Sequence, residues 1–560
     1  MGLAETAGAD AIELIDETVG TQTNVTAIDY ILMDAATVDG DVTNDTGGTI
    51  AGNAAYSAIG VYDGSAVTGA IKNNVGGSIG STDLYNYTIE IRDSSVAGGI
   101  RNDGSLSSVD TAVVIDAGSG EFAGGIVNGG SISSGGLGVD FYGQSFSGEI
   151  SNSGSIESAG AGVYVYVDGD TGYGGDFDGG IDNTGIIQSI SNAGMQIYAG
   201  SLSGGVSNSG TVSAASDTGV YLEVGTLNNG LVNDGTIASG DDGIYVQGDS
   251  LDGGFSNTGS ITSSDGNGVV LSIGAFSGGI DNSGTITAAG DGLSLNVTDF
   301  GDGVVNTGAI QVQGSGILVD SGALVAGDIR NGTGGAIRGV EVDIDGAMGY
   351  IRAARGISLA AGAELDGGVI NEGRIDAEVS IDVAEDAVSG AIENAGTLKG
   401  DLSIAGSNTA GDGIDLANTG SIDLGVPALY PSLISGDFMQ TGSGSLAFTL
   451  LSFTDYAGLP PLTILGSVDL AGDLLLGFDE GFSYAPFARL TLIGVGGART
   501  GLFDNYAGNA LVKRFDSRRA VYIDYTEDGD IALYTTPLPP TWLLFGLGLL
   551  GWYEVARRPG

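Results

Sequence analysis

The stretch from Phe255 to Ile261 reads Phe-Ser-Asn-Thr-Gly-Ser-Ile, and near copies of it recur through most of the chain. Each copy has the form apolar-x-Asn-x-Gly-(Ser/Thr)-(Ile/Val/Leu), with looser, glycine-expanded copies at Asn44, Asn73 and Asn331. From Asn183 to Asn331 the asparagines recur every 24 or 25 residues, and such a fixed period indicates a repeat architecture. The closer copies are centred on Asn102, Asn128, Asn152, Asn183, Asn208, Asn233, Asn257, Asn282, Asn306, Asn371, Asn394 and Asn418.

The inside of one period indicates which repeat architecture this is. Val220, Leu222 and Val224 alternate with Tyr221 and Glu223, which is the two-residue period of a half-buried strand. Each period holds three short apolar segments separated by Gly, Ser, Asn and Asp, and no stretch has helical spacing long enough to cross a sheet. We therefore predict an all-β fold, a single-stranded parallel β-helix of about 15 coils with three short strands per coil.

The recurring asparagine and glycine have physical roles in such a coil. Stacked coils lie about 4.8 Å apart, so an Asn at the same place in each coil can bond its side-chain amide to its neighbours. The twelve asparagines are therefore predicted to form a structural ladder along one corner. The glycine two residues later is predicted to supply a positive φ at that corner.

Composition excludes several classes of function. The 560 residues carry a formal net charge of −52, and this field repels phosphate backbones, so we expect no nucleic-acid partner. The chain contains no cysteine and no histidine. It therefore lacks disulfides, thiolate or imidazole metal ligands, and the His of Ser-His-Asp and Cys-His sites. The acidic side chains are expected on solvated outer faces.

The pattern divides the chain into four predicted parts. Residues 1–40 are expected to form an N-terminal cap or first irregular coil, and residues 41–424 the β-helix repeats. Residues 425–535, richer in Phe and Tyr, are predicted to be a β-rich C-terminal cap, and residues 536–560 a short hydrophobic tail. Residues 1–5 lack the basic start and apolar run of a signal peptide, so we expect the true start or a cleaved signal outside this sequence.

Two irregular segments are candidates for binding. The acidic loop from residue 168 to 178 resembles a calcium loop only at its first two acidic positions, and its calcium candidates are Asp168, Asp170, Asp176 and Asp178. Between Asn331 and Asn371 the interval is 40 residues, which indicates a corner that has lost its Asn. The arginines of this segment either bind an anionic polymer or pair with neighbouring acids, and they are Arg338, Arg352, Arg355 and Arg374.

The C-terminal tail carries the clearest motif. Pro537-Leu538-Pro539 is followed by an apolar run over residues 541–553 and then by Arg557 and Arg558. About 13 apolar residues are too few for a comfortable transmembrane helix of about 20. The tail resembles the PEP-CTERM class of sorting signals, closest to the variant that begins Val-Pro-Leu-Pro, although Thr536 replaces the Val here.

This resemblance implies how the protein is exported and sorted, and it does not imply a catalytic activity. An exosortase-type enzyme of a bacterium with a double membrane would process a protein held transiently in the inner membrane. The product would reach the cell surface or the exopolysaccharide matrix. The alternative is an ordinary C-terminal membrane anchor. The repeats also resemble those of autotransporter and filamentous-haemagglutinin-like adhesins.

Two functions from different classes follow. The first is a non-enzymatic, extracellular surface or biofilm-matrix protein with a structural or adhesive role, because coil geometry accounts for nearly every recurring residue. Exopolysaccharide or other cell-surface glycans are its expected partners, and no cofactor other than Ca²⁺ is considered. The second is a carbohydrate-active β-helix enzyme, a polysaccharide lyase or glycosidase, since paired carboxylates serve glycosidases and acidic residues abound. No catalytic residue is assigned.

Overall fold

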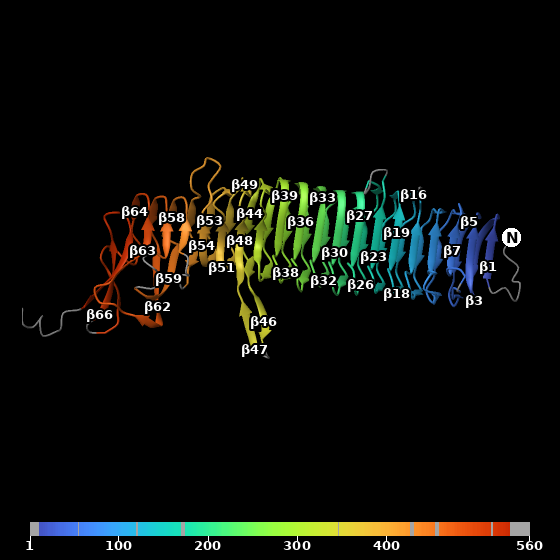
Figure 1. The fold of residues 1–560 in the computed structure, drawn as a ribbon, viewed down its shortest axis with the longest axis horizontal. Helices are drawn as coiled ribbons and strands as arrows, with labels where there is room; N and C mark the ends of the chain where they lie inside the picture. Colours follow the sequence, from blue (N-terminus) through green and yellow to red (C-terminus); the bar gives the residue numbers. More distant parts are fainter. Residues whose placement is uncertain are drawn as a thin grey trace, which may run out of the picture. The chain divides into compact units, whose positions relative to one another are not determined.

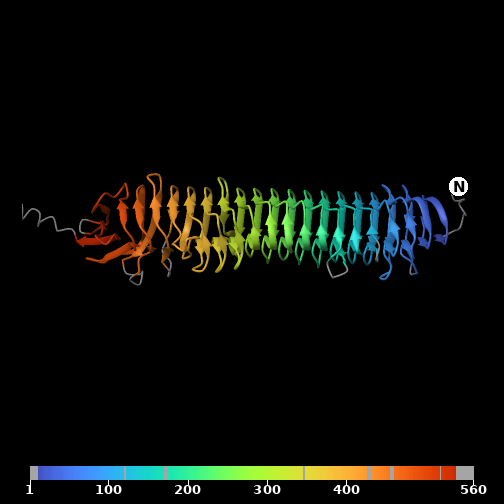
Figure 2. The same ribbon diagram turned by 90° about the horizontal axis from the view of Figure 1, so that it is seen from above.

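The structure is a computed structural model that describes residues 11–53, 55–118, 121–169, 174–344, 347–425, 431–453, 459–516 and 519–537. All regular elements in these ranges are β-strands, which stack in parallel as a β-solenoid of about 17 turns with three strands per coil. The predicted fold class is confirmed. The chain forms two compact units, Met1–Gly327 with Arg338–Ala353 and Asp328–Ile337 with Ala354–Gly560. In each unit the strands stack turn upon turn (Figure 1, Figure 2).

One turn of the first unit shows how the sequence makes the coil. After Asn208 come β29 (Thr211–Ala214), β30 (Val220–Leu227) and β31 (Leu231–Asn233). Val212, Leu222 and Leu231 point inward and are buried, while alternate residues such as Tyr221 and Glu223 face outward. The alternation therefore gives a thin apolar core that continues from coil to coil. In the regular coils the Asn-bearing strands are β13 (Ile100–Asn102), β17 (Ile126–Asn128), β21 (Ile150–Asn152), β25 (Ile181–Asn183), β28 (Val206–Asn208), β31, β34 (Phe255–Asn257), β37 (Ile280–Asn282) and β40 (Gly303–Asn306).

A second family of strands follows the asparagine corner. Each of these strands carries a buried Ile, Leu or Val at its second position, for example Ile237 and Ile261, which lie directly above one another in register. They are β10 (Ser78–Ser81), β14 (Ser105–Ser108), β18 (Ser131–Ser134), β22 (Ser155–Ser158), β26 (Ile186–Ser189), β29, β32 (Thr236–Ser239), β35 (Ser260–Ser263), β38 (Thr285–Ala288) and β41 (Ala309–Val312).

The third family contains the longest strands of the first unit. Within this family the Phe276 ring lies 4.4 Å, centre to centre, from Phe300, and on the neighbouring short strands β20 (Ser145–Phe146) and β24 (Asp176–Phe177) the Phe146 ring lies 4.6 Å from Phe177. The strands are β7 (Ile59–Tyr62), β11 (Ile89–Arg92), β15 (Val113–Asp116), β19 (Val139–Gly143), β23 (Val163–Val167), β27 (Met195–Leu202), β30, β33 (Ile244–Asp252), β36 (Val269–Ser277) and β39 (Leu293–Phe300).

The asparagines of each unit form a ladder of side-chain hydrogen bonds. In the first unit each Asn Nδ2 donates to the Asn Oδ1 of the next coil, from Asn24 through Asn44 and Asn73 to Asn306, for example 2.8 Å from Asn233 to Asn257. In the second unit the ladder joins Asn331, Asn371, Asn394, Asn418 and finally Gln440. All these side chains are buried. Asn24 and Gln440 are members that the motif did not predict.

The glycine of the motif has a different role from the one predicted. None of the glycines two residues after the twelve asparagines has a positive φ. Instead, a Cβ on Gly259 would lie 2.0 Å from the carbonyl oxygen of Gly235, and one on Gly284 would lie 2.1 Å from that of Gly259. The prediction of a positive φ was wrong, because close approach of stacked backbones, not φ, excludes a side chain here.

The long interval between Asn331 and Asn371 is a single coil with an insertion. The Asn331 Nδ2 donates directly to the Asn371 Oδ1 at 2.8 Å, and β44 (Asp328–Asn331) pairs in parallel with β50 (Val369–Asn371). The prediction of a lost corner was therefore wrong. The insertion contains β46 (Val340–Ile344) and β47 (Ala347–Ile351), which form their own two-stranded antiparallel sheet.

Coil pairing extends beyond both predicted limits of the repeats. Near the start, β1 (Ala11–Ile15) pairs in parallel with β4 (Tyr30–Asp34), and β2 (Thr18–Asn24) with β5 (Thr37–Asn44), all within or overlapping the segment 1–40. Beyond residue 424, parallel pairing continues through strands that the sequence placed in a cap. These are β58 (Phe438–Gln440), β61 (Val468–Leu470) and β64 (Arg499–Gly501), and β58 pairs with β55 (Leu416–Asn418) of the predicted repeats.

The last described strands change the direction of pairing. β63 (Arg489–Val495) is parallel to β60 (Leu462–Ile464) on one side and antiparallel to β67 (Ile531–Pro537) on the other. β66 (Arg519–Tyr525) pairs antiparallel with both β67 and β65 (Leu511–Arg514). These antiparallel strands cover the open edge that a solenoid otherwise leaves for another chain.

Candidate functional site

The outward side chains of the long strands form two parallel rows, because coils in register place equivalent residues above one another. Both rows lie in the first unit, on β19, β23, β27, β30 and β33, and we name them together the tyrosine face. One row contains Tyr142, Tyr166, Tyr198, Glu223 and Gln247, and the other contains Asp140, Tyr164, Gln196, Tyr221 and Tyr245.

The tyrosine rings of this face are in contact from coil to coil. Tyr142, which is 44% exposed, stacks on Tyr166 with ring centres 5.3 Å apart and an angle of 12°. Tyr221 stacks on Tyr245 at 5.2 Å and 7°, and Tyr198 bridges the two pairs at 6.0 Å from Tyr166 and 5.7 Å from Tyr221. The result is a continuous, partly exposed aromatic surface that runs along the stacking direction.

Polar side chains hold the tyrosine hydroxyls in defined positions. The Tyr221 hydroxyl donates to Glu223 Oε2 at 3.1 Å, and the Tyr245 hydroxyl donates to Gln247 Oε1 at 3.0 Å. Burial, and then the hydrogen bond to Glu223, raise the pKa of Tyr221 above its ordinary value. This tyrosine therefore stays a neutral hydrogen-bond donor at physiological pH.

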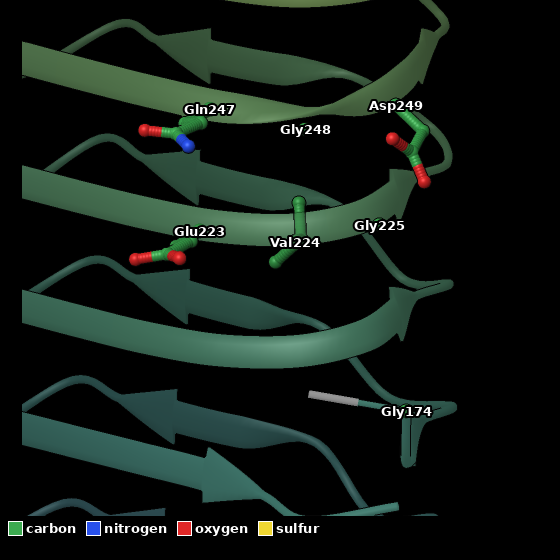
Figure 3. A pocket seen from close by; sticks show the side chains of 7 residues that line it. All are labelled: Gly174, Glu223, Val224, Gly225, Gln247, Gly248 and Asp249. Carbon is green, nitrogen blue, oxygen red and sulfur yellow. The ribbon is translucent and has the colours of Figure 1, made fainter. Parts of the chain in front are cut away.

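A shallow groove runs beside the polar end of the tyrosine face. It consists of two adjoining depressions of about 280 and 310 Å³ that share Gln247, Gly248 and Asp249. Figure 3 shows Glu223 and Gln247 projecting from successive strands, with Asp249 further along. The groove continues over the next two coils, where its polar lining is Ser272, Asn296 and Thr298.

Glycine makes the floor of the groove. A Cβ on Gly248 would lie 2.0 Å from the Val224 carbonyl oxygen, and one on Gly225 would lie 2.5 Å from that of Gly200. Side chains are thus excluded from the floor, while carboxylate and amide groups line its rim. The tyrosine rings can stack on the apolar face of a ligand ring, and the carboxylate and amide groups of the rim can bind the hydroxyl groups of that ring.

Asp140 is a carboxyl group of this face whose pKa is clearly raised. Burial, and then the charge of Asp116, raise the pKa of Asp140 to about 6. The ionised form is disfavoured because the carboxylate is partly removed from water beside a second carboxylate. A carboxyl group that stays protonated toward neutral pH beside another carboxylate is the one observation that favours the carbohydrate-active alternative.

Replacing Asp140 by Asn is expected to stabilise the protein in a pH-dependent way. A raised folded-state pKa means that ionised Asp140 lowers the free energy of unfolding, and this effect begins above the ordinary Asp pKa and is complete above pH 6. Asp140→Asn should therefore raise the free energy of unfolding by about 2 kcal/mol at about pH 7 and leave it unchanged near pH 3. Thermal midpoints across this range check it, and a pH-independent difference would contradict it.

The calcium candidates do not converge where the structure describes them. The Asp168 carboxylate accepts a hydrogen bond from the Tyr142 hydroxyl at 3.1 Å, and Asp176 accepts one from Ser201 at 2.7 Å. Asp178 is exposed, and Asp170 lies outside the described residues. Within the described ranges, no group of three acidic side chains is placed to hold a metal ion.

Two arginines of the irregular segment, Arg355 and Arg374, pair with acids in the second unit. Arg355 Nε lies 2.5 Å from Asp382 Oδ2, and Arg374 lies 2.6 Å from Asp376, which Lys399 also contacts. Asp382 lies on β51 (Arg374–Val383), which pairs with the strand of Arg355, and Asp376 lies on the same strand as Arg374. Arg338 lies at the end of β45 (Ala336–Arg338), and Arg352 follows β47.

The sorting motif cannot be placed. Pro537 ends β67, and Leu538, Pro539, Arg557 and Arg558 lie outside the described residues. Among the residues that the structure does describe, there is no helix of the length and hydropathy needed to cross a membrane. No protein-family model and no curated protein matches this chain.

The tyrosine face could have been predicted from the sequence, but its residues lie outside the asparagine motif that defined the repeats. Tyr164 and Tyr166 alternate with three valines, and Tyr198, Tyr221 and Tyr245 recur at equivalent places in the next coils. Aligning the periods on their long strands, instead of on the asparagine, would have placed these tyrosines in outward rows.

Proposed function

We propose that this protein is a non-enzymatic surface or matrix protein with an adhesive role, and that its tyrosine face binds polysaccharide. The observation that carries the proposal is the run of stacked, partly exposed tyrosines beside an open groove with carboxylate and amide groups. Sugar rings offer apolar C–H faces for aromatic stacking and hydroxyl groups for hydrogen bonds, and tyrosine serves both. The groove is open and repeats from coil to coil, which suits a long polymer better than a small molecule.

The location belongs to the same proposal. We propose that the protein is exported by a bacterium with a double membrane and sorted to the surface through its Pro-Leu-Pro and Arg-Arg tail, with an exosortase-type enzyme as partner. The support is the tail sequence at residues 537–558. The intact mass of the protein recovered from the cell surface tests it, because a mass that still includes Trp542 to Arg558 excludes cleavage.

Removing two tyrosines should abolish most polysaccharide binding. Tyr221→Ala combined with Tyr245→Ala removes a stacked pair from the middle of the tyrosine face, and we expect at least about tenfold weaker binding. Tyr221→Phe keeps the ring and should retain most of the affinity. Binding to a panel of neutral and acidic polysaccharides, measured by affinity electrophoresis of the purified full chain, provides the readout.

A matched control uses a tyrosine outside the face. Tyr85 is 84% exposed in an irregular coil, so Tyr85→Ala should not change binding. Equal binding by the Tyr221/Tyr245 variant and the parent chain would exclude the tyrosine face as the site. Release of reducing or unsaturated sugar ends in the same incubations, and its loss in Asp140→Asn, would favour the enzyme instead.

A further inference from the structure

The basic residues of this acidic chain are concentrated in its last described strands. Six of the 17 Lys and Arg residues fall within residues 489–519, where there are only two acidic residues, Asp504 and Asp516. Lys513, Arg514 and Arg519 are exposed. Arg519 pairs with Asp516 at 2.7 Å and Arg489 pairs with Asp524 at 2.9 Å, so the excess of positive charge in this segment is local and partly neutralised, in a chain whose net charge is −52.

These cations lie over a cluster of aromatic rings. Phe482 stacks on Phe515 with ring centres 5.3 Å apart and an angle of 8°, and Tyr484 lies 6.1 Å from Phe515. Lys513 Nζ is 5.1 Å from the centre of the Phe515 ring, and the Arg519 guanidinium carbon is 5.5 Å from that of Tyr484. Aromatic rings and cations thus share one surface, in the geometry of cation–π contacts.

Phe487 is exposed beside this cluster in an unfavourable backbone conformation. Its side chain is 78% exposed, and its φ is 59°, a region that non-glycine residues rarely adopt. Thr535 fixes the turn, because the Ala488 N–H donates to Thr535 Oγ1 at 2.9 Å and this hydroxyl donates to the Ala485 carbonyl at 2.6 Å. An aromatic ring held in water by a strained turn indicates a function other than folding.

Two members of the cluster, Tyr484 and Arg519, lie beside the last described residues of the chain. The Tyr484 hydroxyl donates to the Thr536 carbonyl oxygen at 3.1 Å, and Arg519 is the register partner of Pro537. In the sequence, the apolar run of residues 541–553 begins four residues later. We name five side chains of this surface the exit collar: Tyr484, Phe487, Lys513, Arg514 and Arg519.

We propose that the exit collar is a docking surface for an anionic lipid bilayer. Lys and Arg attract anionic headgroups, and Phe and Tyr prefer the boundary between headgroups and acyl chains. The apolar run that follows in the chain favours a membrane over a soluble polyanion as the partner. Charges more than about 8 Å from the bilayer are largely screened at physiological ionic strength, so the headgroups meet the local cations of the collar rather than the net charge of −52.

Vesicle binding by the full chain tests the cationic part of the collar. Lys513→Gln, Arg514→Gln and Arg519→Gln together should lower partition onto phosphatidylglycerol-containing vesicles at least about tenfold, and should leave partition onto pure phosphatidylcholine vesicles unchanged. The control triple Lys72→Gln, Arg101→Gln and Arg355→Gln removes the same charge elsewhere and should bind like the parent chain. The apolar tail is present in every sample, so its own contribution cancels.

A second variant separates docking from folding. Phe487→Gly removes the ring and relieves the positive φ, so it should raise the thermal midpoint while lowering partition onto anionic vesicles several-fold. If Phe487 only stabilised the fold, Phe487→Gly would lower the thermal midpoint instead.

Three results would overturn the proposal. These are equal partition of the parent chain onto anionic and neutral vesicles, parent-like binding by the collar triple, and collar-dependent binding of dextran sulfate without vesicle binding. Polysaccharide binding at the tyrosine face should be unchanged in the collar variants, so each proposal can fail without the other.

Discussion

Gly259→Ala is expected to be among the most damaging single substitutions in the chain, with a loss of at least about 3 kcal/mol in the free energy of unfolding. The added Cβ would lie 2.0 Å from the Gly235 carbonyl oxygen of the neighbouring coil. Rotamer changes cannot relieve this contact, because it is made by backbone atoms. The Gly259 N–H also donates to the Asn233 carbonyl, so a shift that made room would break the pairing of the two coils.

A second glycine provides the control. Gly301 has no positive φ, and a Cβ there would meet no atom within 4 Å, so Gly301→Ala should leave stability nearly unchanged. Guanidinium unfolding followed by circular dichroism, with amide exchange over residues 233–284, measures the effect globally and locally. Similar midpoints for the two variants would contradict the close-approach explanation.

The architecture could be read from the sequence because two independent periods agree. The repeat of 24 or 25 residues fixes the length of a coil, and alternation such as Val220, Leu222 and Val224 fixes which side chains are inside. Each local preference supports the same global arrangement, which is the condition for a confident inference of fold. The ends of the array were less readable, because Asn24 has no glycine two residues later and Gln440 replaces the asparagine of its coil.

The role of the motif glycine could not be read from the sequence. A glycine at a corner is compatible with a positive φ or with close approach, and both exclude a Cβ. Only coordinates separate the two, as the carbonyl of Gly235 against Gly259 shows. The 40-residue interval had the same ambiguity, since a lost corner and an inserted hairpin lengthen a period equally.

The candidate site was harder to predict than the fold for a related reason. Tyrosines at alternate positions of a strand are outward-facing in any β-helix, but contact between them depends on the register of separate coils. Tyr166 and Tyr198 are 32 residues apart, because the acidic loop at 168–178 lengthens that coil, yet their rings lie 6.0 Å apart. The groove additionally depends on the backbone at Gly225 and Gly248.

Asn257→Ala is expected to lower the free energy of unfolding by about 3 kcal/mol, because it removes the ladder hydrogen bonds to two buried amide groups. Asn257 accepts from Asn233 Nδ2 at 2.8 Å and donates to Asn282 Oδ1 at 2.7 Å, and all three side chains are buried. Asn257→Asp keeps the acceptor but loses the donor and adds a buried charge. It should therefore be at least as damaging, even though it is nearly isosteric.

The adjacent Ser256 is the control position, since it lies on the same strand as Asn257 but faces outward. Ser256→Ala should change the midpoint of guanidinium unfolding little, and equal midpoints for Ser256→Ala and Asn257→Ala would remove the stabilising role assigned to the ladder. Position in the array supplies a further check. A ladder bond is shared between neighbouring coils, so faster amide exchange in Asn257→Ala should be greatest in β31, β34 and β37 and decrease with each coil beyond them.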